Sequence, residues 1–288
     1  MTWFFDVWHD FDIDRIVYLL NNKKLPKHIV IFAQHEDQCW LEYKNCCQII
    51  NDNNIEVYIV LGSAPGYDYT KLYPIKNMNI YYWPTYWFNY TAYRLVDRIS
   101  KQPIKYNFAC MNNIARPHRI EIIDKIKSKN LHNNAFLTFH KGWTDIDKQY
   151  SLPMQYLRSR FDVVLETSVE RIFITEKTVR PLLCSKPFIT FAAPGFNKFL
   201  QSLGFKPYTG VDYRYDEDVD NRVDLFIESI ENFPKEIDQK EIDYNKNLVY
   251  NIIKNKSLVP QFYLDVIARM PENEIKHIQQ NRLNKILC

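Results

Sequence analysis

A Glu-Lys pair stands near the start of an amphipathic segment in "FITEKTVRPLLC", residues 173–184. Thr175 precedes Glu176 and Lys177, and threonine is a favoured residue at the N-cap of a helix. The first turn of a helix offers free N–H groups and a positive dipole end, which suit a phosphate. Lys177 adds a cation for a diphosphate, and Glu176 has the chemistry to accept hydrogen bonds from ribose hydroxyls. The segment therefore predicts a nucleoside-diphosphate site. An ordinary capped helix is the alternative, because capping signals are common.

More charged residues follow other predicted strands. Glu166 comes directly after the apolar run "FDVVL", and the loop "NNIARPHR" at 112–119 contains His118 and two arginines. Arginine suits bidentate contact with phosphate. In an open α/β sheet, ligands bind where loops leave the carboxyl ends of the strands. We therefore assign one set of residues to donor binding: Arg116, Arg119, Glu166, Thr175, Glu176 and Lys177.

Two successive alternations of strands and helices must position these side chains. The first half predicts strands at 29–33 and 56–61 and a helix at about 40–50. An aromatic strand and loop follow in "MNIYYWP" and "TYWFNYTAYRLVDRI" and lead into a helix that ends near Ser100. The second half predicts strands at 106–111, 136–139, 161–165 and 188–192. Its predicted helices are 120–129, 175–184 and 196–203, followed by a helical tail from about residue 220. This pattern predicts an α/β fold with two Rossmann-like domains facing a cleft. The polar joint "KQPIK" divides it into an acceptor-binding domain at 1–104 and a donor-binding domain at 105–288 that carries the tail.

The run "FDVVLETSVERIFITEKTVRPLLCSKPFI" resembles the donor-nucleotide segment of the α-1,3-fucosyltransferase-like glycosyltransferases. These enzymes have a strand ending in a Glu-containing turn, and then a Tyr/Phe-Ile/Val-Thr-Glu-Lys helix start. The longer stretch through "PGFNKFLQSLGFKPY" and "YDEDVDNR" is similar to viral and phage glycosyltransferase-like proteins. The resemblance covers about residues 106–225. Pro181 and "CSKPF" stand where the fucosyltransferases have a small-residue turn such as Ala-Gly.

The resemblance implies the GT-B architecture and an inverting, metal-independent transfer from a nucleotide sugar, with no further cofactor. Lys177 would contact the diphosphate and Glu176 the ribose. Arg119, or otherwise Arg116, would stabilise the leaving diphosphate, where negative charge builds during transfer. GDP-fucose and a UDP-sugar such as UDP-xylose or UDP-glucose are both open as donors. A glycan or glycoprotein hydroxyl would be the acceptor.

An inverting transfer also needs a general base near the acceptor, normally in the first domain. We expect it among His35, Glu36 and Asp37, which follow the strand at 29–33. Asp6, His9 and Asp10 are further candidates. Aromatic residues in "YYWPTYWF" fit either a stacking surface for an acceptor sugar or buried packing. "YDEDVD" at 215–220 is expected to be a solvated loop and helix start rather than a metal-binding motif.

Composition excludes several function classes. The formal charge is +3 over 288 residues with scattered basic side chains, so nucleic acid is not favoured as a partner. Six cysteines occur without a CxxC pair, which argues against structural zinc and fits a reducing compartment. The acidic start and the absence of a membrane-length apolar run predict a cytoplasmic protein, in the host cytoplasm if a virus encodes it. Two alternatives stay open: a phage-type glycosyltransferase of DNA bases, and a non-catalytic carbohydrate-binding or structural virion protein.

Overall fold

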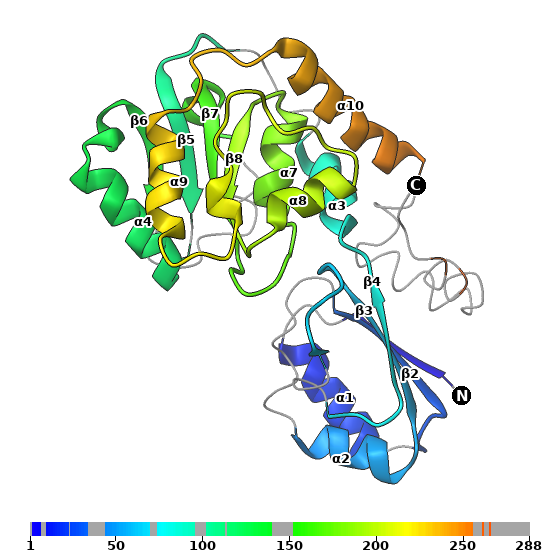
Figure 1. Ribbon diagram of the computed structural model, residues 1–288. Helices are drawn as coiled ribbons and strands as arrows, with labels where there is room; N and C mark the ends of the chain where they lie inside the picture. Colours follow the sequence, from blue (N-terminus) through cyan, green and yellow to red (C-terminus); the bar gives the residue numbers. More distant parts are fainter. Residues whose placement is uncertain are drawn as a thin grey trace. The chain divides into compact units, whose positions relative to one another are not determined.

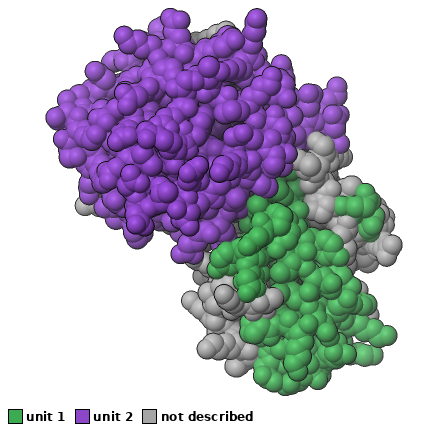
Figure 2. All heavy atoms as spheres, viewed as in Figure 1, with its two compact units in different colours: residues 1–86, 258–288 green, residues 87–257 purple. Residues whose placement is uncertain are grey.

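The structure is a computed structural model that describes residues 2–6, 10–22, 24–33, 44–69, 74–95, 102–112, 114–139 and 152–255, with residues 261 and 265. Contacts between Cα atoms divide the chain into two compact units (Figure 2). Unit 1 comprises residues 1–86 with 258–288, and unit 2 comprises residues 87–257. Each unit contains one parallel sheet. The domain boundary at residues 104 and 105 stays a prediction.

Unit 1 is built on a four-stranded parallel sheet whose spatial order follows the chain, β1-β2-β3-β4. Its strands are β1 (Thr2–Asp6), β2 (His28–Ala33), β3 (Glu56–Leu61) and β4 (Met78–Tyr82). Helix α1 (Asp10–Asn22) connects β1 to β2, and α2 (Lys44–Asp52) lies between β2 and β3. Because the strands follow in order and crossovers are right-handed, both helices fall on the same face of the sheet (Figure 1).

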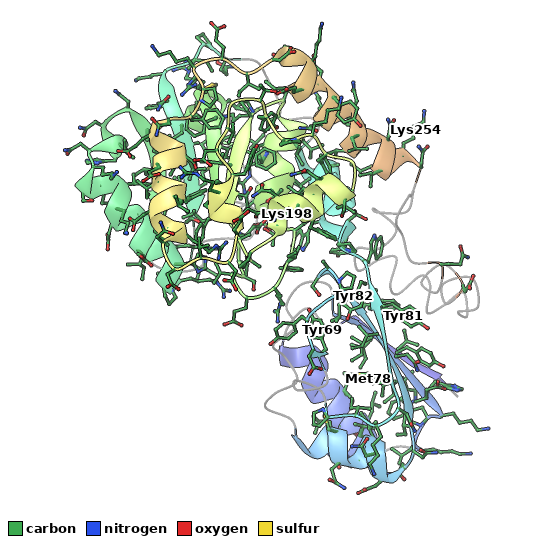
Figure 3. All side chains as sticks on the ribbon, in the orientation of Figure 1. Tyr69, Met78, Tyr81, Tyr82, Lys198 and Lys254 are labelled. Atoms are coloured by element: carbon green, nitrogen blue, oxygen red, sulfur yellow. The ribbon has the colours of Figure 1, made fainter. Side chains whose placement is uncertain are left out.

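The core of unit 1 lies between that face and the two helices. Ile29 and Ile31 of β2 and Val57 and Ile59 of β3 alternate onto this face and pack against apolar residues of α1 and α2. Beyond β3, the loop brings the buried Tyr69 against Tyr82 of β4, with ring centroids 6.3 Å apart (Figure 3). This aromatic pair extends the core of unit 1 toward β4.

Unit 2 has a sheet of different order, β6-β5-β7-β8, again with parallel strands. The strands are β5 (Tyr106–Asn112), β6 (Ala135–Phe139), β7 (Ser159–Leu165) and β8 (Phe188–Phe191). The helices are α3 (Tyr86–Leu95), α4 (Pro117–Ser128), α6 (Met154–Leu157), α7 (Glu176–Leu183), α8 (Phe196–Ser202), α9 (Arg222–Glu231) and α10 (Gln239–Lys254). Two 3-10 turns, Leu131–Asn134 and Arg214–Asp216, complete the described part.

Helices cover both faces of the unit 2 sheet (Figure 1). On one face, Phe108, Phe161 and Ile189 pack against apolar residues of α4 and α9. On the other face, α7 contacts β7. That second face also buries charge, because Lys186 donates to Ser159 Oγ at 2.6 Å and Tyr156 donates to Asp162 at 2.8 Å.

The α/β class and the two parallel sheets expected from the sequence are confirmed. Strand β3 has the predicted bounds, α7 is one residue shorter than predicted at each end, and α8 is one residue shorter at its C-terminal end. Strand β1 and helix α1 were not predicted, and α4 begins three residues earlier than expected. Among the described residues, no helix is both long and apolar enough to cross a membrane.

Helix α7 ends in a turn that normally uses glycine. Ser185 has φ +52°, in the left-handed region, and its N–H donates to Leu182 O at 3.3 Å. Lys186 N donates to Pro181 O at 3.0 Å, which completes a Schellman motif. An L-residue in the left-handed region is strained, so this serine performs the task that an Ala-Gly turn would perform with less strain.

We expect Ser185→Gly to raise the free energy of unfolding of unit 2 by about 0.5–1 kcal/mol, because the relief of strain exceeds the extra entropy of the unfolded chain. Urea denaturation monitored by circular dichroism measures this difference. Ser185→Ala is the matched control, since it also removes the hydroxyl but keeps the strain. Equal stability of the two variants would contradict this account of the turn.

Candidate active site

The strand order of unit 2 reverses direction at β5, which defines a topological switch point. From β5 the chain passes to β6 on one side and then returns to β7 on the other. The loops that leave the carboxyl ends of β5 and β7 therefore diverge, and such a point is where open α/β sheets bind ligands. β5 ends at Asn112 and β7 at Leu165, so Glu166 begins the second of these loops.

Glu166 is fully buried, and both of its carboxylate oxygens accept hydrogen bonds. Thr175 donates twice, from N to Oε1 at 3.1 Å and from Oγ1 to Oε2 at 2.6 Å. Thr178 Oγ1 donates to Oε1 at 2.7 Å, and Thr167 N donates to Oε2 at 3.2 Å. With four donors on two oxygens and no exposed surface, this carboxylate holds the β7–α7 loop onto the start of α7 and offers no open oxygen to a ligand.

The main chain of Glu166 ties this loop to its neighbours. Its N–H donates to Phe191 O of β8 at 2.9 Å. Its carbonyl oxygen accepts from Arg119 Nη2 at 2.9 Å and lies 3.1 Å from His118 Nε2. Because a carbonyl can only accept, Nε2 of His118 carries the proton. Arg119 Nη1 also donates to Ile114 O at 3.1 Å, so one guanidinium links the loops after β5 and β7.

The start of α7 presents the Glu-Lys pair. Thr175 is the N-cap, as predicted, and its hydroxyl oxygen accepts from Lys177 N. Lys177 Nζ lies 2.9 Å from Glu176 Oε1, and the two side chains are 16% and 11% exposed. Burial raises the pKa of Glu176, but the charge and hydrogen bond of Lys177, with Arg180, more than offset it, so the pKa of Glu176 lies below its ordinary value. Glu176 is therefore a carboxylate at neutral pH.

The two arginines of the β5–α4 loop differ in burial. Arg119 is 2% exposed, and burial lowers the pKa of its guanidinium, while the nearby charge of Glu166 opposes this effect. Arg116 is only partly buried and serves as the N-cap residue of α4, without a capping hydrogen bond from its side chain. Within the described residues, Nε of either arginine has no hydrogen-bond partner. Arg119 thus organises the site, whereas Arg116 is the more accessible cation.

His118 packs between these groups and stays neutral. Its ring stacks on Phe191, with centroids 6.4 Å apart. Burial lowers its pKa to about 4, and the positive charges of Arg119 and Arg116 act in the same direction, against the hydrogen bond to Glu166. Sequence reasoning noted His118 in the loop without giving it a role. Thr167 and Thr178 were also not assigned, although the spacing of Thr175 and Thr178 already places both on one face of a helix.

The remaining sequence candidates fall in different places. His35, Glu36, Asp37 and His9 lie outside the described residues, as do the side chains of Asp6 and Asp10. The indole and phenol rings of Trp83, Tyr86 and Trp87 are buried, at 0%, 2% and 7% exposure, so the packing interpretation holds.

The interpretation of "YDEDVD" as a solvated loop is wrong for its first half. Asp216 is 4% exposed, and its carboxylate accepts from the main-chain N–H groups of Asn197 and Lys198. It therefore caps the start of α8. In the described part of the chain, no three His, Cys, Asp or Glu side chains form a group suited to a metal ion.

Comparison with known proteins gives one distant structural similarity. No family model matches the chain, and no curated protein matches it in sequence. A solved structure described as the crystal structure of an α1,3-fucosyltransferase aligns with 89% of this chain and 91% of its own chain. The TM-score is 0.44 and the sequence identity is 11%. These values are too low to establish a shared fold, so the chemistry of the site follows from its own geometry.

We expect acid to destabilise the protein partly through His118. Because the pKa is about 4 in the folded chain and 6.5 as the ordinary value, the unfolded chain binds the proton first as the pH falls. The contribution of neutral His118 is complete above pH 6.5 and is lost as the pH falls toward 4. Urea denaturation should show that, between pH 7 and pH 5, the free energy of unfolding falls by up to about 2 kcal/mol more in the wild type than in His118→Gln. The amide of glutamine can still donate to Glu166 O, so equal losses would contradict the assignment.

Substitution of the two arginines by lysine should change the free energy of unfolding by different amounts. Arg119→Lys is expected to lower the free energy of unfolding by about 1–3 kcal/mol, because a single ammonium cannot replace the guanidinium that spans Ile114 O and Glu166 O. Arg116→Lys is the matched control and should change it by no more than about 0.5 kcal/mol. Thermal and urea denaturation of both variants measure the difference. A larger loss in Arg116→Lys would reverse the assignment.

Proposed function

We propose that the protein is a glycosyltransferase that takes its sugar from a nucleotide-activated donor bound at the carboxyl edge of the unit 2 sheet. The observation that carries the proposal is that Arg116, Glu176 and Lys177 belong to the two loop-to-helix segments that the buried Arg119 joins at the switch point. These are two cations and one carboxylate, which match the diphosphate and ribose of a sugar nucleotide.

The cations would act on the leaving group. Glycosyl transfer breaks the bond between the anomeric carbon and the diphosphate oxygen, and negative charge builds on that oxygen. Lys177 and Arg116 would stabilise this charge at the departing diphosphate, because they are positioned before the reaction occurs. The buried Arg119 would add a positive potential from behind the loop. Side-chain cations in this role make the transfer metal-independent in our proposal.

Glu176 would bind the other end of the nucleotide. Its carboxylate is ionised at neutral pH and lies at the start of α7, one residue from the cation. Two oxygens can accept from two vicinal hydroxyls, which is how acidic residues bind ribose in Rossmann-like domains. The ion pair with Lys177 keeps the acid and the diphosphate-binding cation at a fixed separation.

The rest of the reaction scheme extends this proposal. A base in unit 1, among His35, Glu36 and Asp37, would deprotonate the acceptor hydroxyl of a glycan or glycoprotein. Attack from the face opposite the diphosphate would invert the anomeric centre. GDP-fucose and a UDP-sugar such as UDP-xylose or UDP-glucose are the donor candidates.

A thermal-shift panel with GDP, UDP, ADP and CMP, each with and without EDTA, tests the donor site. We expect one nucleoside diphosphate to raise the melting temperature equally in both conditions, because binding to the folded state stabilises it. Lys177→Ala should weaken the binding of that nucleotide about tenfold or more, since it removes a charged hydrogen bond. No shift with any nucleotide would overturn the proposal.

Lys125→Ala is the matched control for this variant. Lys125 is also an ion-paired lysine of unit 2, with Asp224 as its partner. It lies in the last turn of α4, whereas the first turn of α4 is at the switch point, so the length of the helix separates it from the site. This control should bind the nucleotide as the wild type does. Equal weakening in both lysine variants would mean that Lys177 acts only through general charge.

A further inference from the structure

We propose that Glu166 is the positioning residue for Lys177 and acts through the hydroxyl groups of two threonines without touching the donor. This inference rests on the proposed function for its effect on binding, whereas the positioning itself is independent of any nucleotide. Glu166 makes no direct hydrogen bond to the Lys177 ammonium in this network. Thr175 and Thr167 lie between them, and each is hydrogen-bonded both to the Glu166 carboxylate and to Lys177 Nζ.

The first link is the proton of Thr175. A hydroxyl group has one proton to donate and lone pairs to accept with. The 2.6 Å bond to Glu166 Oε2 uses that proton. The lone pairs of Oγ1 are then directed toward Lys177, whose N lies at 3.3 Å and whose Nζ lies at 3.4 Å. The carboxylate therefore determines which side of the Thr175 oxygen faces the lysine.

The second link runs through Thr167. Its N–H donates to the same Oε2 of Glu166 at 3.2 Å, and its Oγ1 accepts from Lys177 Nζ at 3.3 Å. With Glu176 Oε1 at 2.9 Å, the ammonium has three acceptors for its three N–H donors. Two of the three belong to residues that Glu166 holds in place.

This arrangement orders a side chain that is otherwise costly to immobilise. A lysine loses several rotatable bonds when it is fixed, and a ligand that must order it binds more weakly. Lys177 Nζ is held by three acceptors of the protein, and its side chain is 16% exposed. The affinity for the diphosphate is therefore expected to depend on the charge of the buried Glu166.

Thr178 offers a control within the same network. Its Oγ1 donates to Glu166 Oε1 at 2.7 Å, a bond comparable to that of Thr175. Its side chain is buried. No hydrogen bond joins it to Lys177 among the contacts of the described residues. Thr178→Val thus removes a bond to the same carboxylate while leaving the acceptors of Lys177 in place.

The experiment compares Glu166→Gln with Thr178→Val in the full chain. In Glu166→Gln the amide N–H group faces Thr175 N and Thr178 Oγ1 in one orientation, and Thr175 Oγ1 and Thr167 N in the other. In both orientations a main-chain N–H of a residue that contacts Lys177 loses its acceptor, so the position of that residue is no longer fixed. We expect acetylation of Lys177 by acetic anhydride, quantified by mass spectrometry, to speed up several-fold in Glu166→Gln and to stay at the wild-type rate in Thr178→Val. GDP or UDP, whichever stabilises the wild type, should bind Glu166→Gln about tenfold more weakly. Guanosine or uridine should bind it as before.

The outcomes separate positioning from general destabilisation. Equal acetylation rates in Glu166→Gln and Thr178→Val would overturn the positioning role. An equal loss of affinity for the nucleoside and its diphosphate would overturn it as well. If the wild type binds no nucleotide but Lys177 still reacts faster in Glu166→Gln, the proposed function fails while the positioning role stands. Should Glu166→Gln not fold, Thr175→Val and Thr175→Ser replace it, with the faster acetylation expected only in the valine variant.

Discussion

The candidate site depends on one buried residue, Glu166, in which every polar atom is bonded. Its N–H continues the sheet to β8, its carbonyl accepts from Arg119 and His118, and its carboxylate accepts from the start of α7. A buried carboxylate is costly unless its hydrogen bonds are satisfied. Because four donors meet it here, the cost is offset and the geometry is fixed at the same time. Helix α4, strand β8 and the start of α7 are thus joined at a single residue.

The charges around this residue are arranged so that buried groups are compensated by partners within the protein. Arg119 donates to two carbonyl oxygens and lies near the negative charge of Glu166, so its burial does not leave an isolated cation. Glu176 and Lys177 form a second pair closer to the surface. Arg116 is partly exposed, and Nε of both Arg116 and Arg119 has no hydrogen-bond partner within the described residues. An anion at this edge would therefore reach Arg116 more readily than the buried Arg119.

Much of the framework could be predicted from sequence because apolar runs bounded by polar turns identify parallel strands. Strand β1 was missed because "TWFFD" is short and is followed by an acidic stretch without turn residues. The N-cap at Thr175 was predictable from local chemistry. The role of Glu166 was not predictable. The sequence shows that an acidic residue follows β7, but it does not show that threonines nine and twelve residues later donate hydrogen bonds to its carboxylate oxygens. Asp216 was misjudged for the same reason: its partners, at the start of α8, are distant in sequence.

The scarcity of glycine, only 6 in 288 residues, is consistent with how this edge would bind a phosphate. Glycine-rich loops present main-chain N–H groups at close range. Here the first turn of α4 has few to present, because Pro117 has none and the amides of Arg119 and Ile120 donate to Arg116 O. At α7, the amide of Lys177 is bonded to Thr175. A diphosphate would accordingly be bound by side-chain cations, whose reach removes the need for a close backbone approach. In glycine-rich loops the backbone itself fixes the positions of the phosphate-binding groups. Here other residues must fix the positions of the cations, and we assign this role to Glu166.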